Sequence, residues 1–217
     1  MSLGVRDIVR SYDSPVVRTY AAIRFQILRQ RFLDEIGQYL PEQGRILDVG
    51  CGFGLFALYF AGQSAGRDVQ GFDYNARRIA MATRSAERIG LANCRFTVAD
   101  AAVAAIDQPF DAVYMLDILH HIPVPAVAPL ISRITHSLAP GGRLIVKDVA
   151  DRPVHKRWFT WALDKAMDYR TPVSYWCIDD MRRMLAGQGY VVHVHQMVDY
   201  LPYPHVIYVC TRNGGPA

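Results

Sequence analysis

Apolar and polar positions along the chain alternate between helical spacing and short continuous apolar runs. Within residues 21–40 an apolar side chain recurs about once per helical turn, and charged residues lie between the apolar ones. This spacing predicts an amphipathic helix over 21–40. Pro41 and Gly44 end this pattern, and the run Arg45–Val49 is typical of a short buried strand. The amino-terminal part is therefore predicted to be helical and to lead into the first strand.

The same alternation continues through the chain. The pattern predicts strands at 68–72, 94–98, 110–116 and 143–149, and helices near 54–64, 75–89 and 124–138. Strands that alternate with helices indicate a parallel sheet covered on both faces. Further on it predicts a helix-like stretch at 155–169, a short helix at 178–187 and strands at 190–197 and 205–211. We expect a doubly wound α/β fold with seven strands, mostly parallel, that ends in an antiparallel hairpin.

Composition favours a single globular domain. The 217 residues are 51% hydrophobic and 20% charged, far from the composition of a disordered chain. We expect one domain over residues 1–217, divided as follows: a helical cover over 1–44, a core over 45–150, an insert over 151–189 and a terminal hairpin over 190–217. The net charge is +4 and the basic residues are scattered, which argues against a nucleic-acid partner.

The cysteines and the amino terminus indicate the cellular compartment of the protein. Cys51, Cys94, Cys177 and Cys210 form no C-x-x-C pair, which favours a reducing compartment. We find no signal peptide and no membrane-spanning run, since the longest apolar stretch is Leu55–Ala61. A cytoplasmic protein is expected, and peripheral contact with a membrane stays open.

A glycine-rich turn follows the first strand. Gly50, Gly52 and Gly54 lie between the strand and the next helix, where glycines let a ligand approach the backbone and the helix start offers N–H groups. A nucleotide-like ligand suits this turn, although a tight turn without a ligand has the same glycines. The spacing is G-x-G-x-G rather than the dinucleotide pattern G-x-G-x-x-G, and the sequence contains no triphosphate-binding loop.

Acidic residues follow the next two strands. Asp73 ends the second strand, where a carboxylate can accept hydrogen bonds from the hydroxyls of a ribose. Asp100 follows the third strand and can accept a hydrogen bond from an adenine amino group. A helix cap is the alternative for each of them.

Three motifs together resemble those of the class I S-adenosylmethionine-dependent methyltransferases of the small-molecule type. They are Asp48–Gly54, which fits D-x-G-x-G-x-G, then Phe110–Ile122 and Leu138–Leu144. The resemblance covers roughly residues 45–150 and implies a Rossmann-like fold, S-adenosylmethionine as cofactor and S-adenosylhomocysteine as product. Phe53 departs from the family, in which a small or hydroxylated residue is common there. The cofactor-binding residues implied are Asp48, Gly50, Cys51, Gly52, Gly54, Asp73, Tyr74, Asp100, Ala101 and Leu116.

Two adjacent histidines follow the fourth strand. His120 and His121 are candidate catalytic bases for an acceptor that loses a proton, because histidine titrates near neutral pH. Alternatively they order the loop and start the next helix. Asp117 and Asp148 end strands and suit Mg²⁺, but two carboxylates without a third ligand are weak evidence, so we expect no metal.

Aromatic residues are dense in 151–177, where the resemblance implies the acceptor pocket. We expect a small or medium apolar or aromatic acceptor, methylated on oxygen or carbon. Basic residues among the aromatics also suit a membrane surface or a carrier protein, hence a lipid-like, quinone-like or carrier-bound polyketide acceptor. A catalytically inactive cofactor-binding subunit is the alternative outside enzymology. The candidate pocket residues are Tyr12, Tyr20, Trp158, Trp161, Tyr175 and Trp176, and packing is the alternative for each.

Overall fold

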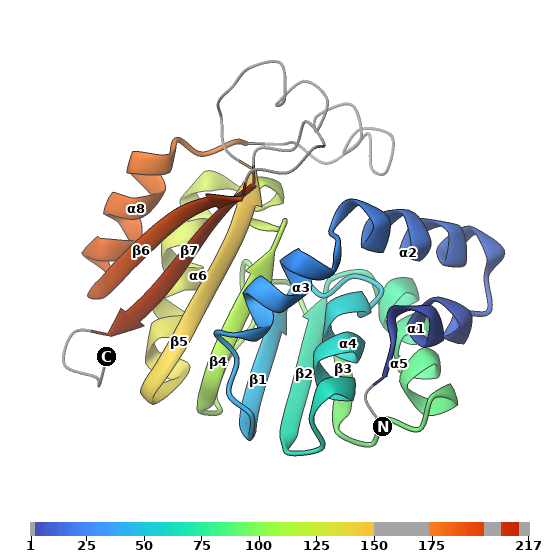
Figure 1. The fold of residues 1–217 in the computed structure, drawn as a ribbon. Helices are drawn as coiled ribbons and strands as arrows, with labels where there is room; N and C mark the ends of the chain where they lie inside the picture. Colours follow the sequence, from blue (N-terminus) through green and yellow to red (C-terminus); the bar gives the residue numbers. More distant parts are fainter. Residues whose placement is uncertain (1–2, 150–173, 198–204, 213–217) are drawn as a thin grey trace.

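The computed structural model describes residues 3–149, 174–197 and 205–212, and the strands in these ranges form one seven-stranded sheet (Figure 1). The strand order is β3-β2-β1-β4-β5-β7-β6. Neighbours from β3 to β5 are parallel, while β7 runs antiparallel to both β5 and β6. This confirms the predicted sheet and its hairpin. The strands are β1 (Gly44–Val49), β2 (Arg67–Asp73), β3 (Cys94–Val98), β4 (Phe110–Leu116), β5 (Leu138–Val149), β6 (Tyr190–Met197) and β7 (His205–Arg212).

Helices cover both faces of the sheet (Figure 1). One core cluster lies against α1 to α5, and a second lies against α6 and α8. The strands supply both clusters by alternation: Tyr114 and Leu116 pack on the first face, whereas Val113 and Met115 pack on the second. The helices are α1 (Val5–Ser11), α2 (Pro15–Ile27), α3 (Gln30–Gly37), α4 (Leu55–Gln63), α5 (Ala76–Arg88), the 3-10 turn η1 (Leu119–His121), α6 (Val124–Ser137) and α8 (Ile178–Gly187).

The single helix predicted over 21–40 is wrong, because the chain breaks at Leu28 into α2 and α3. Leu28 leaves helical torsions, with φ −94° and ψ 71°, and its side chain is buried. The rings of Phe25 and Phe32 each lie 6.0 Å from the ring of Phe56. Phe25 of α2 and Phe32 of α3 therefore contact the same residue of α4 from the two sides of the break, a tertiary contact that helical periodicity does not predict.

Two further differences concern element ends. Helix α1 lies before the stretch 21–40, within the helical cover predicted over 1–44, and α2 begins earlier than that stretch, at Pro15, where the Ser14 hydroxyl accepts from the Val17 N–H at 3.5 Å. Strand β5 begins at Leu138 rather than at residue 143, with a shift of register opposite Phe110. The stretch 155–169 lies outside the described residues, and the division of the chain into a cover, a core and an insert stays a prediction.

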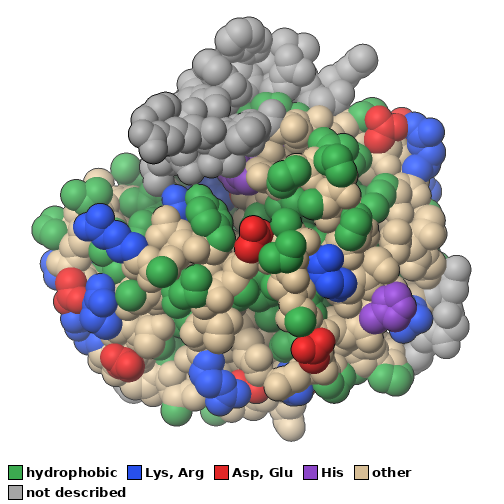
Figure 2. All heavy atoms as spheres, turned by 180° about the vertical axis from the view of Figure 1, so that it is seen from behind, with side chains coloured by type: hydrophobic (Ala, Val, Ile, Leu, Met, Phe, Trp, Pro, Cys, Tyr) green, Lys and Arg blue, Asp and Glu red, His purple; other side chains and the backbone are tan. Residues whose placement is uncertain are grey.

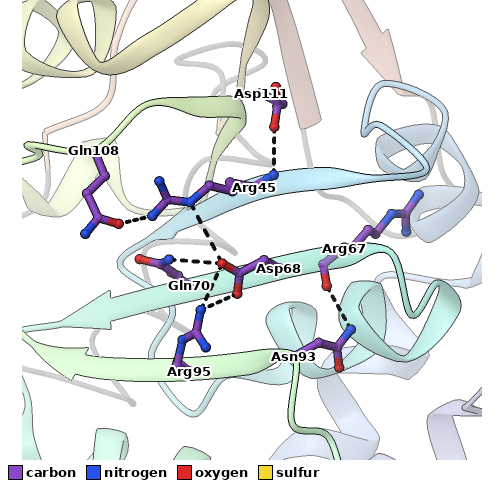
Figure 3. Close-up of polar contacts among 8 residues, drawn as sticks. All are labelled: Arg45, Arg67, Asp68, Gln70, Asn93, Arg95, Gln108 and Asp111. Atoms are coloured by element: carbon purple, nitrogen blue, oxygen red, sulfur yellow. Dashed lines mark hydrogen bonds and ion pairs between the residues drawn. The ribbon is translucent and has the colours of Figure 1, made fainter.

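Polar side chains join β1, β2 and β3 at their amino-terminal halves (Figure 3). The Arg95 guanidinium donates to both carboxylate oxygens of Asp68, at 2.7 and 2.9 Å, and the Arg45 guanidinium lies 3.8 Å from the same carboxylate. The Asp111 carboxylate accepts from the Arg45 backbone N–H at 2.7 Å. These partly exposed contacts lie away from the carboxyl ends of the strands, where the cavity described below is found.

No helix among the described residues is long and apolar enough to span a membrane.

Candidate functional site

A cavity of about 530 Å³ lies at the carboxyl ends of β1, β2 and β4, with α2 along one side. Open α/β sheets bind ligands at this edge, where the loops after the strands meet. Its walls come from segments far apart in the sequence: α2, the glycine turn, the ends of β2 and β3, and the loop after β4. Cofactor candidates that line it are Asp48, Gly50, Cys51, Gly52, Asp73, Tyr74, Asp100, Ala101 and Leu116.

The glycine turn has a backbone that only glycine adopts easily. Gly50, Gly52 and Gly54 have φ of 74°, 55° and 75°. A Cβ atom on Gly50 would lie 1.7 Å from Ile118, and one on Gly54 would lie 2.6 Å from Phe96, whereas one on Gly52 would meet nothing within 4 Å. Gly54 caps α4 and does not line the cavity. Gly52 therefore offers an open path to the backbone, and its two neighbours fix the turn.

Asp73 holds this turn in place. Its carboxylate accepts the Gly52 N–H at 3.0 Å and the Asn75 N–H at 2.9 Å. Asn75, rather than Asp73, caps α5, since its side chain accepts from the N–H groups of Arg77 and Arg78. A carboxylate has lone pairs for further donors, so Asp73 can still accept hydroxyl groups from a ligand in the cavity.

Asp48 is a buried acid at the end of β1. The Tyr114 hydroxyl donates to its carboxylate at 3.1 Å. Burial raises the pKa of Asp48 to about 8; the Tyr114 hydrogen bond opposes this and the nearby Asp73 charge adds to it. A cationic ligand group beside Asp48 would therefore favour its ionised form.

The remaining cofactor candidates lie at the rim and in the wall of the cavity. Asp100 accepts the Ala102 N–H at 2.8 Å, as a turn-capping carboxylate does, and it lines the cavity as well. Tyr74 is 57% exposed at the rim, whereas Ala101 and Leu116 are buried in the wall. These residues present both polar and apolar surface to a nucleoside-like ligand.

The two histidines differ in their surroundings. His120 is buried, and its Nδ1 contacts the carboxylate of Asp148, which also accepts the His120 backbone N–H at 3.1 Å. The His121 ring lies 4.1 Å from that of His120, and both histidines line the cavity. The Tyr175 ring stacks on His120 at 5.8 Å. The sequence pattern suggested Asp148 only as a possible Mg²⁺ ligand and did not predict its contact with His120.

An ion-pair cluster joins α2 to the end of β4. The Asp117 carboxylate contacts the Arg24 guanidinium and the Lys147 ammonium, and Lys147 is fully buried. Desolvation lowers the pKa of Lys147, while the Asp117 charge opposes this shift. Asp117 has φ 58°, which is unusual for a residue other than glycine and marks a strained backbone beside the cavity. Sequence reasoning missed Arg24 and Lys147, because only the fold brings them to Asp117.

Only some of the candidate pocket residues line the cavity. Tyr20 lines the cavity, whereas Tyr12 is buried behind it and donates its hydroxyl to the Phe53 carbonyl at 2.7 Å. Trp176 packs against the core cluster of α6 and α8 and is not among the lining residues. Trp158 and Trp161 lie outside the described residues. Ile23 and Ile27 also line the cavity and were missed, although they share a helix face with Tyr20.

The residues present fit S-adenosylmethionine. The open backbone at Gly52 admits a ligand, Asp73 suits ribose hydroxyls, and Asp48 suits a cationic end. Within the described ranges, no group of three or more His, Cys, Asp or Glu side chains is placed to hold a metal ion.

Comparison with known proteins agrees with this geometry. A family model described as a methyltransferase domain matches residues 20–195, most of the chain. The ubiquinone biosynthesis O-methyltransferase of Xylella fastidiosa is 34% identical over 119 residues, which are 54% of this chain and 47% of that protein. The protein of the same name from Cereibacter sphaeroides is 33% identical over 130 residues, 59% of this chain and 51% of that protein. The chain thus matches about half the length of these curated relatives.

Solved structures share the fold. A TehB-like S-adenosylmethionine-dependent methyltransferase from Corynebacterium glutamicum superposes with a TM-score of 0.65 at 20% identity, over 92% of this chain and 100% of that one. Magnesium protoporphyrin IX methyltransferase from Synechocystis, with bound S-adenosylhomocysteine, gives a TM-score of 0.67 at 20% identity over 96% and 93%. The motifs, the fold and the family match together show that this chain belongs to the class I S-adenosylmethionine-dependent methyltransferases.

Proposed function

We propose that this protein transfers the methyl group of S-adenosylmethionine to a hydroxyl oxygen of a small or medium aromatic acceptor. One observation carries the proposal: a single cavity joins the glycine turn and Asp73 to the apolar side of α2 and to His120. The first part suits the cofactor and the second suits an acceptor. A cavity of about 530 Å³ is in the usual range for small-molecule sites.

The cofactor, when bound, supplies an electrophilic methyl group on a positively charged sulfur. The chain's own residues hold the acceptor oxygen in line with that methyl group and exclude water, which accounts for much of the catalysis of such a displacement. Tyr20, Ile23 and Ile27 supply apolar surface along α2 for the acceptor ring. The proposed cofactor residues line the cavity, and Gly54 supports the turn beside them: Asp48, Gly50, Cys51, Gly52, Asp73, Tyr74, Asp100, Ala101 and Leu116.

Several observations favour a phenol-like or quinone-like acceptor. The curated relatives are named for ubiquinone biosynthesis and for O-methylation. On the face shown in Figure 2, Lys and Arg side chains are scattered among hydrophobic and polar ones, which supports a small-molecule acceptor rather than nucleic acid.

The four cysteines are free, which supports a cytoplasmic location.

The first test is cofactor binding. S-adenosylhomocysteine should bind in calorimetry and raise the melting temperature, because the folded cavity binds it and the unfolded chain does not. At 100 times the dissociation constant the stabilisation should be about 2.7 kcal/mol. A melting curve unmoved by saturating ligand, with no heat of binding, would contradict the assignment.

The second test is the acceptor. Incubating the protein with methyl-labelled cofactor and a panel of phenols and quinols, followed by mass spectrometry, should give labelled methyl ethers. Label on carbon would instead favour ring methylation. Cofactor binding without methylation of any compound, including those of a cell extract, would favour the inactive-subunit alternative.

A further inference from the structure

The loop after β3 forms one side of the cavity. Asp100, Ala101 and Ala102 of this loop all line it, and Asp100 is the residue that we assign to the amino group of adenine. Adenine offers that amino group as a hydrogen-bond donor. A carboxylate recognises such a donor only when its oxygen lies at the right distance and angle. The position of this loop is therefore part of the cofactor site.

Hydrogen bonds within the loop form a single tight turn. The Asp100 carbonyl accepts the N–H groups of Val103 and Ala104, at 3.1 and 2.7 Å. Its carboxylate accepts the Ala102 N–H at 2.8 Å. These bonds fix the shape of the turn. The attachment of the turn to the rest of the fold depends on other contacts.

The side chains of this loop are small. Residues 99–105 read Ala-Asp-Ala-Ala-Val-Ala-Ala, and Val103 is 77% exposed. Ala101 is buried in the core cluster that lies against α6, but a methyl group contributes little contact area. A polar contact from a neighbouring element therefore has a large effect on where the loop lies.

Arg133 makes this contact from α6. Its Nη2 donates to the carbonyls of Ala101 and Ala102, at 2.7 and 3.0 Å. One terminal nitrogen of a guanidinium carries two hydrogens, so both bonds form at once. Arg133 is not among the residues that line the cavity. It therefore acts on the loop rather than on a ligand.

The rest of the guanidinium argues against a role in stability alone. The Arg133 Nε is buried and has no hydrogen-bond partner among the described residues. A buried donor without a partner lowers stability and offsets what the two carbonyl bonds contribute. Stability therefore gives little reason for an arginine at this position, whereas a fixed loop gives one.

We propose that Arg133 is a positioning residue for recognition of adenine: it holds the loop after β3 so that the Asp100 carboxylate meets the amino group of the base. The selectivity of the site for adenine then depends on a side chain of α6 that does not touch the cofactor. This inference rests on the cofactor part of the proposed function and deepens it. The identity of the acceptor does not enter.

The first experiment follows the loop without a ligand. In hydrogen exchange measured by NMR, the amides of Ala102, Val103 and Ala104 should exchange at least threefold faster in Arg133→Met than in the parent. The variant keeps an unbranched side chain but loses the donors that attach the turn to α6. Unchanged exchange in the variant overturns the proposal.

The second experiment compares two ligands by calorimetry. They are S-adenosylhomocysteine and its deaminated analogue S-inosylhomocysteine, in which a carbonyl replaces the amino group of the base. The parent should bind the first at least about tenfold more tightly, the scale for one hydrogen bond to a charged group. In Arg133→Met this preference should fall at least threefold, through weaker binding of S-adenosylhomocysteine.

Arg67 provides a matched control. Its guanidinium donates to the carbonyls of Pro41 and Phe60, at 2.8 and 3.1 Å, and Arg67 does not line the cavity. Arg67→Met should lower the melting temperature at least as much as Arg133→Met, because Arg67 is the more buried of the two. Its preference between the two ligands should stay within twofold of the parent. An equal change of preference in both variants would assign the effect to lost stability and overturn the proposal.

The remaining outcomes separate this inference from the proposed function. Parental preference in folded Arg133→Met, or an equal loss of affinity for both ligands, overturns the positioning role and leaves the methyltransferase assignment intact. A parent that binds both ligands equally overturns it too, because the loop then does not recognise the base. A parent that binds neither ligand overturns the cofactor assignment as well. If Arg133→Met does not fold, Arg133→Gln, with its shorter side chain, is measured by the same criteria.

Discussion

At the scale of single residues, Asp73 combines a structural contact with the binding role we propose. Its carboxylate holds the Gly52 N–H, while Asn75 caps the following helix. A helix-cap role and a ligand-binding role therefore fall on different side chains. This separation permits a matched pair of variants.

Asp73→Ala should weaken S-adenosylhomocysteine binding by about 1.5–3 kcal/mol, the scale for losing a hydrogen bond to a charged group. Asn75→Ala should instead cost about 1 kcal/mol of folding stability through the lost cap, with affinity within twofold of the parent. Calorimetry and thermal melts measure the two effects. An unchanged dissociation constant in folded Asp73→Ala would show that this carboxylate only orders the turn.

Asp48 should make stability depend on pH. Its pKa is about 8 in the folded protein and about 3.9 in the unfolded chain, so the folded state retains a proton that the unfolded chain loses over this range. The unfolded state binds fewer protons there, and the free energy of unfolding therefore falls as pH rises from about 4 to 8.

Asp48→Asn removes this titration. At pH 8 the variant should be more stable than the parent by at least about 1 kcal/mol, or about 2–4 °C in melting temperature, and the difference should shrink toward pH 4. Asp180→Asn, at an exposed site on α8, serves as the control. A pH-independent difference between Asp48→Asn and the parent would show that the carboxyl group is already ionised in the folded protein.

At the scale of elements, α2 has two apolar faces. Val17, Ala21 and Phe25 are buried against the core, while Tyr20 and Ile23 line the cavity. The ion pair between Arg24 and Asp117 joins this helix to the end of β4. The helix therefore serves both as a core element and as a cavity wall.

Ile23→Asn should lower kcat/KM for an aromatic acceptor about tenfold, a loss of about 1.4 kcal/mol, because it places a polar group in the apolar wall. Ile23 is already 53% exposed, so we expect little change in melting temperature. Val16→Asn is the control, since Val16 is 77% exposed on the same helix and is not among the lining residues. Equal losses in both variants would indicate a general effect on α2 rather than contact with the acceptor.

At the scale of the whole molecule, the cavity belongs to no single element. Parallel strands bring their carboxyl ends to one edge, so Asp48 and Asp73, at the ends of β1 and β2, line the same space as Asp100, which follows β3. The order of strands and turns was enough to predict Asp73 and Asp100, whereas Asp48 was implied by the resemblance to the methyltransferases. The two core clusters pack helices against both faces of the sheet. The edge formed by the carboxyl ends of the strands is therefore the part that can bind a ligand.

The sequence by itself determined the alternation of strands and helices, the antiparallel end and the glycine turn. These are local properties, because side-chain period and backbone torsion depend on near neighbours. Only the tertiary structure decided the break at Leu28, where a buried side chain leaves helical torsions and the helices on either side pack Phe25 and Phe32 on one ring of α4. It also separated Tyr20 from Tyr12, because core packing sets the rotation of each helix.

Side-chain contacts between residues far apart in the chain could likewise not be predicted from the sequence. Arg24 and Asp117 are 93 residues apart, and His120 and Asp148 are 28 apart. Nothing in the local pattern ties such residues together. The sheet brings them into contact by placing the end of β5 beside the end of β4 and α2 across them, and this placement distinguishes His120 from His121.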